Sequence, residues 1–224
     1  LVLEGAVPGV APEDNLVMKA ARALAARCAT RQGAIITLDK RIPLGAGLGG
    51  GSSDAASVLL GLNRLWELGL PRAAVVNMLD RERADFDATM AALKELAPGA
   101  VAIQIPIGSE AGFRGVVNLV SMTATTYDAG SPTGSTGPIP DDLADQAQAA
   151  REALIDVVAE NDDALIEKYL EGEEITTEEL IGAILAGVKE GRIFPVVCAA
   201  GAPAIGVDRA LDLVTEALPS PADA

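Results

Sequence analysis

Residues 43–53 read PLGAGLGGGSS and lie between two segments of clear secondary-structure pattern. The preceding residues 34–38, AIITL, are rich in β-branched side chains and predict a short strand. Ser53 and Asp54 then open a predicted helix that runs to about Leu68, because apolar residues recur along one side of it. Further upstream, Asp14 and Asn15 are capping residues that open a predicted helix from about Asn15 to Cys28. The order of strand, glycine-rich loop and helix places this part of the chain in the α/β class.

The glycine-rich loop is a candidate phosphate site. Glycines let a backbone turn tightly and approach an anion without a Cβ clash. The free N–H groups and the dipole of the following helix favour phosphate, and Ser52 and Ser53 can add hydroxyl donors or reach a phosphate-bound Mg²⁺. The alternative is a flexible turn in which Ser53 acts only as the helix N-cap, and the loop alone leaves both interpretations open.

The residues around the loop carry a resemblance. Residues 15–17 (NLV), 38–43 (LDKRIP), 52–56 (SSDAA) and 62–66 (LNRLW) resemble the 4-diphosphocytidyl-2-C-methyl-D-erythritol kinases. These enzymes belong to the GHMP kinase superfamily and serve isoprenoid biosynthesis. The resemblance implies an ATP phosphate loop formed by Gly47, Leu48, Gly49, Gly50, Gly51, Ser52 and Ser53.

The kinase resemblance stops before its site is complete. The catalytic lysine of the family would lie upstream of Leu1, and its Gly-Ala-Asp-Val-Pro stretch with the catalytic aspartate should follow Leu70, where this sequence departs. Phosphoryl transfer depends on positioning and charge stabilisation by several groups together. We therefore expect weak phosphate binding and no transfer.

The rest of the chain has its own pattern of elements. Strands are predicted at residues 73–77, 100–105, 115–120, 121–127 and 192–198, and helices at 86–96, 142–159, 162–171, 177–187 and 207–218. Residues 128–140 are rich in Gly, Ser, Thr and Pro and predict a loop. Thr176 precedes first-turn acids, as helix starts prefer.

This second segment resembles the C-terminal half of the GTP-binding domain of translation elongation factor G. The resemblance begins at residues 74–86, AVVNMLDRERADF, and continues to residues 218–221, LPSP. It implies that Asn77 and Asp80 contact guanine, with Met78 in place of a lysine that lies along the base. Alternatively, Asp80 is a helix-capping acid and Asn77 a turn residue at a strand end.

The same resemblance has further implications. The P-loop and both switch regions of the family would precede Asn77, and the loop at residues 47–53 lacks the Gly-Lys-Ser/Thr ending of a P-loop. Residues 106–191 would be the subdomain that this family inserts in its GTP-binding domain, which contacts ribosomal stalk protein. The alternative for that acidic stretch is a solvated set of helices.

Charge divides the chain in the same place. Residues 1–75 hold 8 basic and 6 acidic residues, whereas the remainder holds 9 and 26, so the net charges are +2 and −17. The acidic part is not expected to bind nucleic acid, because it would repel the phosphates. There is no histidine, which excludes Ser-His-Asp and Cys-His catalysis. The 2 cysteines are expected to be free thiols in a cytoplasmic protein, and no apolar stretch predicts a membrane span.

The sequence thus predicts an α/β chain in two parts. Residues 1–72 are predicted to be a kinase-derived βα fragment, and residues 73–224 a partial GTPase-type parallel sheet with an inserted α+β subdomain. The leading function is a fragment of an elongation factor G-like GTPase, not competent for hydrolysis. The alternatives are an ATP-binding fragment of the isoprenoid-pathway kinase and a non-catalytic chimera. Mg²⁺ is expected only with bound ATP or GTP, and no metal site of the chain's own is predicted.

Overall fold

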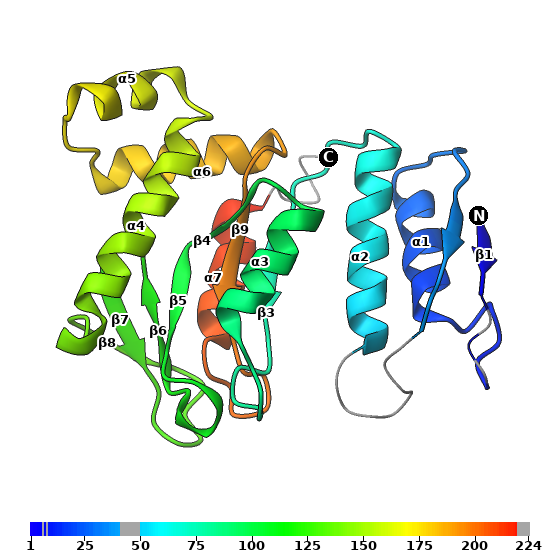
Figure 1. The fold of residues 1–224 in the computed structure, drawn as a ribbon, viewed down its shortest axis with the longest axis horizontal. Helices are drawn as coiled ribbons and strands as arrows, with labels where there is room; N and C mark the ends of the chain where they lie inside the picture. The colour runs from blue at the N-terminus through cyan, green and yellow to red at the C-terminus, as the bar shows by residue number, and fades with distance from the viewer. Residues whose placement is uncertain (6, 8, 41–49, 219–224) are drawn as a thin grey trace. The chain divides into compact units, whose positions relative to one another are not determined.

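The chain folds as two compact units, Leu1–Gly69 and Leu70–Ala224, which we call unit 1 and unit 2. The structure, a computed structural model, describes residues 1–5, 7, 9–40 and 50–218. Both units combine helices with strands (Figure 1). The α/β fold class predicted from the sequence is therefore confirmed.

Unit 1 has two strands and two helices among its described residues. They are β1 (Val2–Glu4), α1 (Leu16–Arg27), β2 (Ile35–Thr37) and α2 (Gly50–Leu65). The strands are parallel, with Val2 opposite Ile35 and Glu4 opposite Thr37. Since β1 was not predicted, the sheet of this unit could not be foreseen from β2 alone.

The two helices of unit 1 pack against each other over a small core. Its buried members are Ala21 of α1, Leu62 of α2 and Trp66, with Ile36 of β2 among the partly buried residues around them. The Trp66 indole Nε1–H donates to the carbonyl oxygen of Gly33 at 3.1 Å. Trp66 is the only tryptophan of the chain, so its fluorescence reports on this unit.

Of the two helices in unit 1, α1 has the predicted N-cap residue, whereas α2 begins earlier than predicted. Asn15 caps α1 as predicted, since its side chain accepts a hydrogen bond from the Val17 N–H at 2.9 Å. Helix α2, in contrast, begins at Gly50, three residues before the predicted start. Ser53 is therefore inside the helix, and its alternative role as N-cap is wrong.

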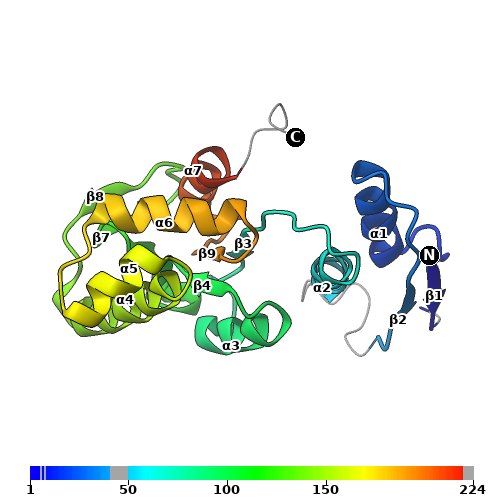
Figure 2. The ribbon, with the colours of Figure 1, turned by 90° about the horizontal axis from the view of Figure 1, so that it is seen from above.

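Unit 2 is built on a parallel sheet with strand order β3-β9-β4. The strands are β3 (Ala74–Val76), β9 (Phe194–Cys198) and β4 (Ala100–Ala102), and β9 is buried at every position. Helix α3 (Phe86–Leu96) covers one face, and α6 (Thr177–Lys189) and α7 (Val207–Ala217) lie on the other (Figure 2). Covered faces are what a parallel sheet requires.

A second, antiparallel sheet extends unit 2, with the order β5-β6-β7-β8. Its strands are β5 (Gln104–Ile107), β6 (Gly115–Asn118), β7 (Thr123–Thr126) and β8 (Ser135–Gly137). Two predictions are corrected here. The single strand at residues 100–105 is two strands, β4 and β5, which belong to different sheets, and the predicted loop at residues 128–140 contains β8.

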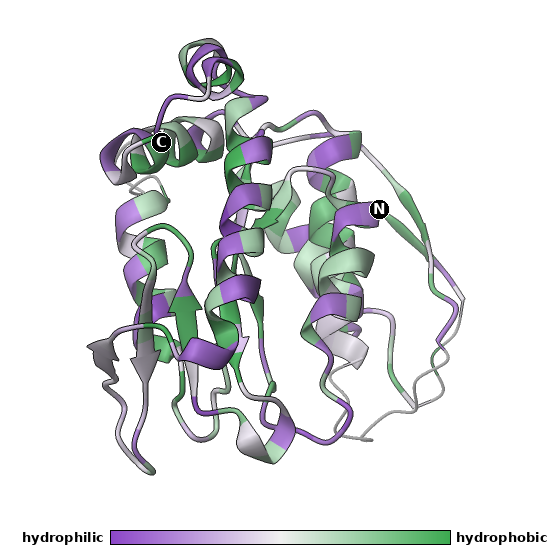
Figure 3. Cartoon of the chain, turned by 60° about the vertical axis from the view of Figure 1, so that its left-hand side comes forward, coloured by the Kyte–Doolittle hydropathy of each residue, from purple (hydrophilic) through white to green (hydrophobic). Residues whose placement is uncertain are grey.

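The helices predicted in the acidic stretch are present as α4 (Ala144–Ala159), α5 (Asp163–Glu171) and α6, and two short 3-10 helices occur at Glu110–Gly112 and Asp141–Leu143. The Arg151 guanidinium ties α4 to the antiparallel sheet, because its Nη1 donates to the carbonyl oxygens of Leu119 and Val120, each at 2.6 Å. The helices carry both hydrophilic and hydrophobic residues (Figure 3), as expected where one side is packed.

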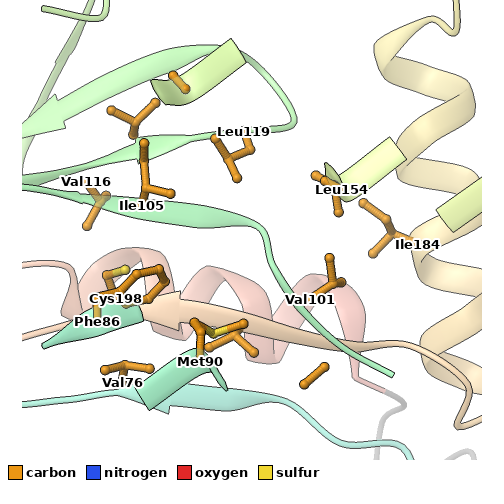
Figure 4. Packing of buried hydrophobic residues seen from close by; sticks show 14 of the residues in the cluster. Val76, Phe86, Met90, Val101, Ile105, Val116, Leu119, Leu154, Ile184 and Cys198 are labelled. Atoms are coloured by element: carbon orange, nitrogen blue, oxygen red, sulfur yellow. The ribbon is translucent and has the colours of Figure 1, made fainter. Parts of the chain in front are cut away.

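One continuous core joins the elements of unit 2. Buried side chains from both sheets and from α3, α4 and α6 meet there, among them Met90, Val116, Leu154, Ile184 and Val196. In Figure 4, Leu154 and Ile184 point toward each other from their two helices. The core cluster of unit 2 is far larger than the cluster of Ala21, Leu62 and Trp66 in unit 1, so unit 2 has the greater capacity for hydrophobic stabilisation.

Glu179 at the start of α6 makes the free energy of unfolding of unit 2 depend on pH in the acidic range. Thr176 and Glu179 form a capping box, and the Lys168 Nζ donates to Glu179 Oε1 at 2.6 Å. Lys168, followed by the Thr176 donors, lowers the pKa of Glu179 to about 2, from an ordinary value of 4.5. A lowered pKa in the folded state stabilises that state above pH 4.5, and the contribution disappears as the pH falls toward 2.

We therefore expect Glu179→Gln to lower the urea midpoint of unit 2 at pH 7 and to have less effect as the pH approaches 2. Glutamine keeps a capping acceptor but loses the charge. Far-UV circular dichroism of the wild type and the variant at several pH values measures this. An equal difference between the two proteins at pH 7 and pH 2 would contradict the assignment.

Candidate functional site

A pocket of about 200 Å³ lies between the first turns of α1 and α2 in unit 1. Most of its wall is apolar: Val7, Val10, Leu16, Val17 and Leu38. Pockets for complete drug-sized ligands usually measure about 300–1,000 Å³. This pocket therefore has room for a planar ring system but not for a whole nucleotide.

The pocket lining also includes four polar residues: Asp14, Asn15, Lys40 and Asp54. Asn15 is only 7% exposed. Its Oδ1 is used by the cap of α1, and among the described residues we find no hydrogen-bond partner for its Nδ2. The Lys40 ammonium forms an ion pair with the Asp54 carboxylate. The pocket thus combines an apolar wall with one available amide donor and a paired charge.

The predicted phosphate-binding residues fall partly at this pocket. Gly50, Gly51, Ser52 and Ser53 form the first turn of α2, and Gly51 lines the pocket. Ser52 and Ser53 are exposed. The N–H groups of a first helical turn have no partner within the helix and favour an anion. Gly47, Leu48 and Gly49, the other predicted residues, lie outside the described part of the chain.

The predicted guanine-binding residues lie at the carboxyl end of β3 in unit 2. The Asn77 side chain, through its Oδ1, accepts a hydrogen bond from the Gly201 N–H at 3.0 Å. The Leu79 N–H donates to the carbonyl oxygen of Ala199 at 3.4 Å. These bonds join the turn after β3 to the turn after β9, since both strands end at the same edge of the parallel sheet.

One of the two alternatives for this edge is wrong, and Met78 has an unusual backbone conformation. Asp80 does not cap α3, because the N-cap is Asp85, whose side chain accepts from the Ala88 N–H at 2.9 Å. Asp80 instead lies 3.7 Å from the Arg81 Nε. Met78 is exposed and has a φ of 64°, an uncommon conformation for a residue with a Cβ. The methionine therefore occupies a tight turn and points into solvent.

Other kinds of site are not found among the described residues. They contain no group of three or more His, Cys, Asp or Glu residues arranged to hold a metal ion. Cys28 and Cys198 are both free, and burial raises the pKa of the Cys198 thiol, which leaves it unreactive. No helix in this part of the chain is long and apolar enough to cross a membrane.

Sequence reasoning missed most of the pocket. Lys40 was noticed only as part of the kinase resemblance, and Asn15 only as part of that resemblance and as a helix cap. Both had a signal, because Lys40 lies shortly before the glycine-rich loop in the sequence and Asn15 opens α1, whose first turn lines the same pocket as Gly51. The apolar wall had none, since Val7, Val10 and Leu38 come from separate segments that only the fold brings together.

Comparison with known proteins supports the kinase part of the interpretation. Residues 15–95 match the family described as the GHMP kinases N terminal domain. The matched span includes Asn15, Lys40 and the whole of α2, and it continues past Gly69 into the first elements of unit 2. It is less than half of the chain, so it identifies a region of kinase similarity.

A solved structure is similar over more of the chain. The crystal structure of ttk003000868 from Thermus thermophilus matches with a TM-score of 0.65 and 31% sequence identity over 85% of this chain. The chain spans only 27% of the length of that protein, whose title names no activity. Neither comparison bears on the resemblance to elongation factor G, which stays a prediction. What the comparisons support at the level of a family is a GHMP kinase N-terminal region at residues 15–95.

Proposed function

We propose that unit 1 binds ATP, with the base in the apolar pocket and the phosphates along the first turn of α2. The observation that carries this proposal is the position of the pocket against that turn, which belongs to the region similar to GHMP kinases. A pocket of about 200 Å³ accommodates a base and leaves the phosphates outside it, where the helix N–H groups are.

The polar groups fit this arrangement. Asn15 Nδ2 offers a donor to a ring nitrogen, and the exposed Ser52 and Ser53 hydroxyls can reach phosphate oxygens or a Mg²⁺ ion that arrives with them. The more specific identity that we propose is a fragment of 4-diphosphocytidyl-2-C-methyl-D-erythritol kinase. Because the sequence after Leu70 lacks the Gly-Ala-Asp-Val-Pro stretch, we propose binding without phosphoryl transfer.

Filling the pocket from α2 tests the binding mode. A Cβ at Gly51 would lie 3.2 Å from the Leu16 Cδ1, whereas a Cβ at Gly61 of the same helix would contact nothing within 4 Å. Gly51→Leu should therefore weaken ATP binding more than tenfold, and Gly61→Leu should not, since both changes favour the helix equally. Isothermal titration calorimetry on the full chain measures both.

The outcome that contradicts the proposal is equal ATP affinity in the two variants, or no ATP binding by the wild type at millimolar concentration. The absence of transfer is checked separately with radiolabelled ATP or GTP and Mg²⁺, with and without diphosphocytidyl-methylerythritol. Phosphate release at the buffer-blank rate is expected. Turnover that is lost in a Gly50→Val, Ser53→Ala variant would show a working site.

A second candidate function is binding of a guanine nucleotide by unit 2, as a fragment of an elongation factor G-like GTPase. The hydrogen bond between Asn77 and Gly201 favours it, because it holds together the two turns that would contact the base. Met78 stands against strong binding, since it replaces the lysine of that motif and points into solvent. In this family, the acidic stretch of residues 106–191 would contact ribosomal stalk protein, and the exposed Leu170 on α5 suits such a contact.

For unit 2 we expect GDP to raise the melting temperature no more than ADP does. A ligand raises the melting temperature only if it binds the folded state. The turns after β3 and β9 offer contacts to a guanine base, but the phosphate-binding part of such a site is absent from the described residues. Differential scanning calorimetry with each nucleotide measures this. A shift specific to GDP that disappears in Asp80→Asn would instead establish a working guanine site.

A further inference from the structure

The Lys40–Asp54 ion pair links two described residues that flank the glycine-rich loop in the sequence. Lys40 immediately precedes residues 41–53, and Asp54 immediately follows them on the fifth position of α2. The side chains are 13% and 29% exposed, so the pair is partly shielded from solvent. Both residues line the pocket. The ion pair therefore lies beside the site that we propose for ATP.

Asp54 poses a problem for phosphate binding at this helix end. The first turn of α2 carries no acidic residue, so Asp54 is the first carboxylate after the N–H groups that attract an anion. A carboxylate near a bound phosphate repels it, and partial burial weakens the screening by salt. Asp14, the other acid at the pocket, is 69% exposed and pairs with Lys19 at 3.0 Å. Its charge is therefore better screened than that of Asp54.

From this arrangement we infer that Lys40 is a positioning and charge-neutralising residue for the phosphates. It cancels the Asp54 charge and holds Asp54 away from the first turn, so the pair determines how much each added phosphate contributes to affinity. This inference rests on the proposed ATP binding and deepens it. A purely structural ion pair would instead affect a nucleoside and a nucleotide equally.

The number of phosphates on the ligand separates these two roles. We expect Lys40→Met to weaken ATP binding about tenfold or more, while adenosine binding changes by less than about threefold, with AMP and ADP between them. The loss should shrink at high salt, because it is a charge effect. Lys40→Arg should retain affinity, since it keeps the positive charge. Calorimetric titration of the full chain with the four ligands measures the series.

A double variant keeps the test valid if Lys40→Met folds poorly with an unpaired carboxylate. Lys40→Met, Asp54→Asn removes both charges at once and should recover most of the lost ATP affinity. A loss that is equal for adenosine and ATP, or a double variant as weak as Lys40→Met, would overturn the inference. Failure of the wild type to bind either ligand would overturn the proposed function itself, which is a distinguishable result.

Discussion

Replacing Gly206 with alanine is expected to destabilise unit 2 by several kcal/mol. Gly206 precedes α7 with a φ of 73°, and an added Cβ would lie 2.3 Å from the carbonyl oxygen of Cys198. The left-handed conformation alone costs about 1–2 kcal/mol for a residue with a Cβ. The overlap with the backbone at the end of β9 adds about 1–3 kcal/mol, as other overpacking does.

Gly172 provides a matched control for this prediction. It ends α5 with the same φ of 73°, but a Cβ there would meet nothing within 4 Å. Gly172→Ala should therefore cost only the conformational strain of about 1–2 kcal/mol. Urea unfolding followed by far-UV circular dichroism compares the two. Equal losses would mean that the contact with Cys198 relaxes freely.

The second large effect is expected at Leu154 in α4. This side chain is fully buried and points toward Ile184 (Figure 4). Leu154→Ala should lower the free energy of unfolding of unit 2 by about 2–5 kcal/mol, because it removes buried methyl groups and leaves a cavity.

The control for Leu154 is Leu170 of α5, which is 79% exposed. Leu170→Ala should change the free energy of unfolding by no more than about 0.5 kcal/mol, as surface substitutions usually do. Chemical denaturation of both variants under one condition gives the comparison. A small effect at Leu154 would show that α4 does not share the core of the sheets.

The sequence predicted helices best where side-chain chemistry marks their ends. Asn15 and Thr176 were predicted at helix starts, and each accepts the hydrogen bond expected of a cap. Such a cap depends on residues close in sequence, so a single sequence contains the necessary information. The start of α2 was placed too late because glycine has a low helix propensity, which tertiary packing overrides at Gly50.

The strands were harder because their partners are distant in sequence. Residues 100–105, AVAIQI, read as one mostly apolar strand, yet the Ile103 N–H donates to the carbonyl oxygen of Val196 while its own carbonyl accepts from the Leu119 N–H. Ile103 thus lies where the chain passes from the parallel to the antiparallel sheet. β8 was missed because its Ser and Thr residues resemble a loop, although the Thr125 and Thr136 hydroxyls lie 3.3 Å apart across the strands.

The site was only partly predictable for the same reason. Gly50 and Ser53 were found from a local pattern, but Val7 and Leu38 join the pocket through the pairing of β1 with β2 and the packing of α1 on α2. The spacing of Val7 and Leu38 along the sequence does not indicate that they line one pocket. A local motif therefore indicated the phosphate end of the site, and the fold was needed to find the other end.

The central claim is that unit 1 folds on its own core and carries the nucleotide site. Urea unfolding with and without Mg²⁺ and ATP tests it most directly, using two probes on the same samples. Trp66 fluorescence reports on unit 1, and far-UV circular dichroism reports mainly on unit 2, which holds α3 to α7. We predict two separate transitions, of which ATP moves only the Trp66 transition to higher urea. A single shared transition, or an ATP shift in the dichroism signal without one in Trp66 fluorescence, would contradict the account.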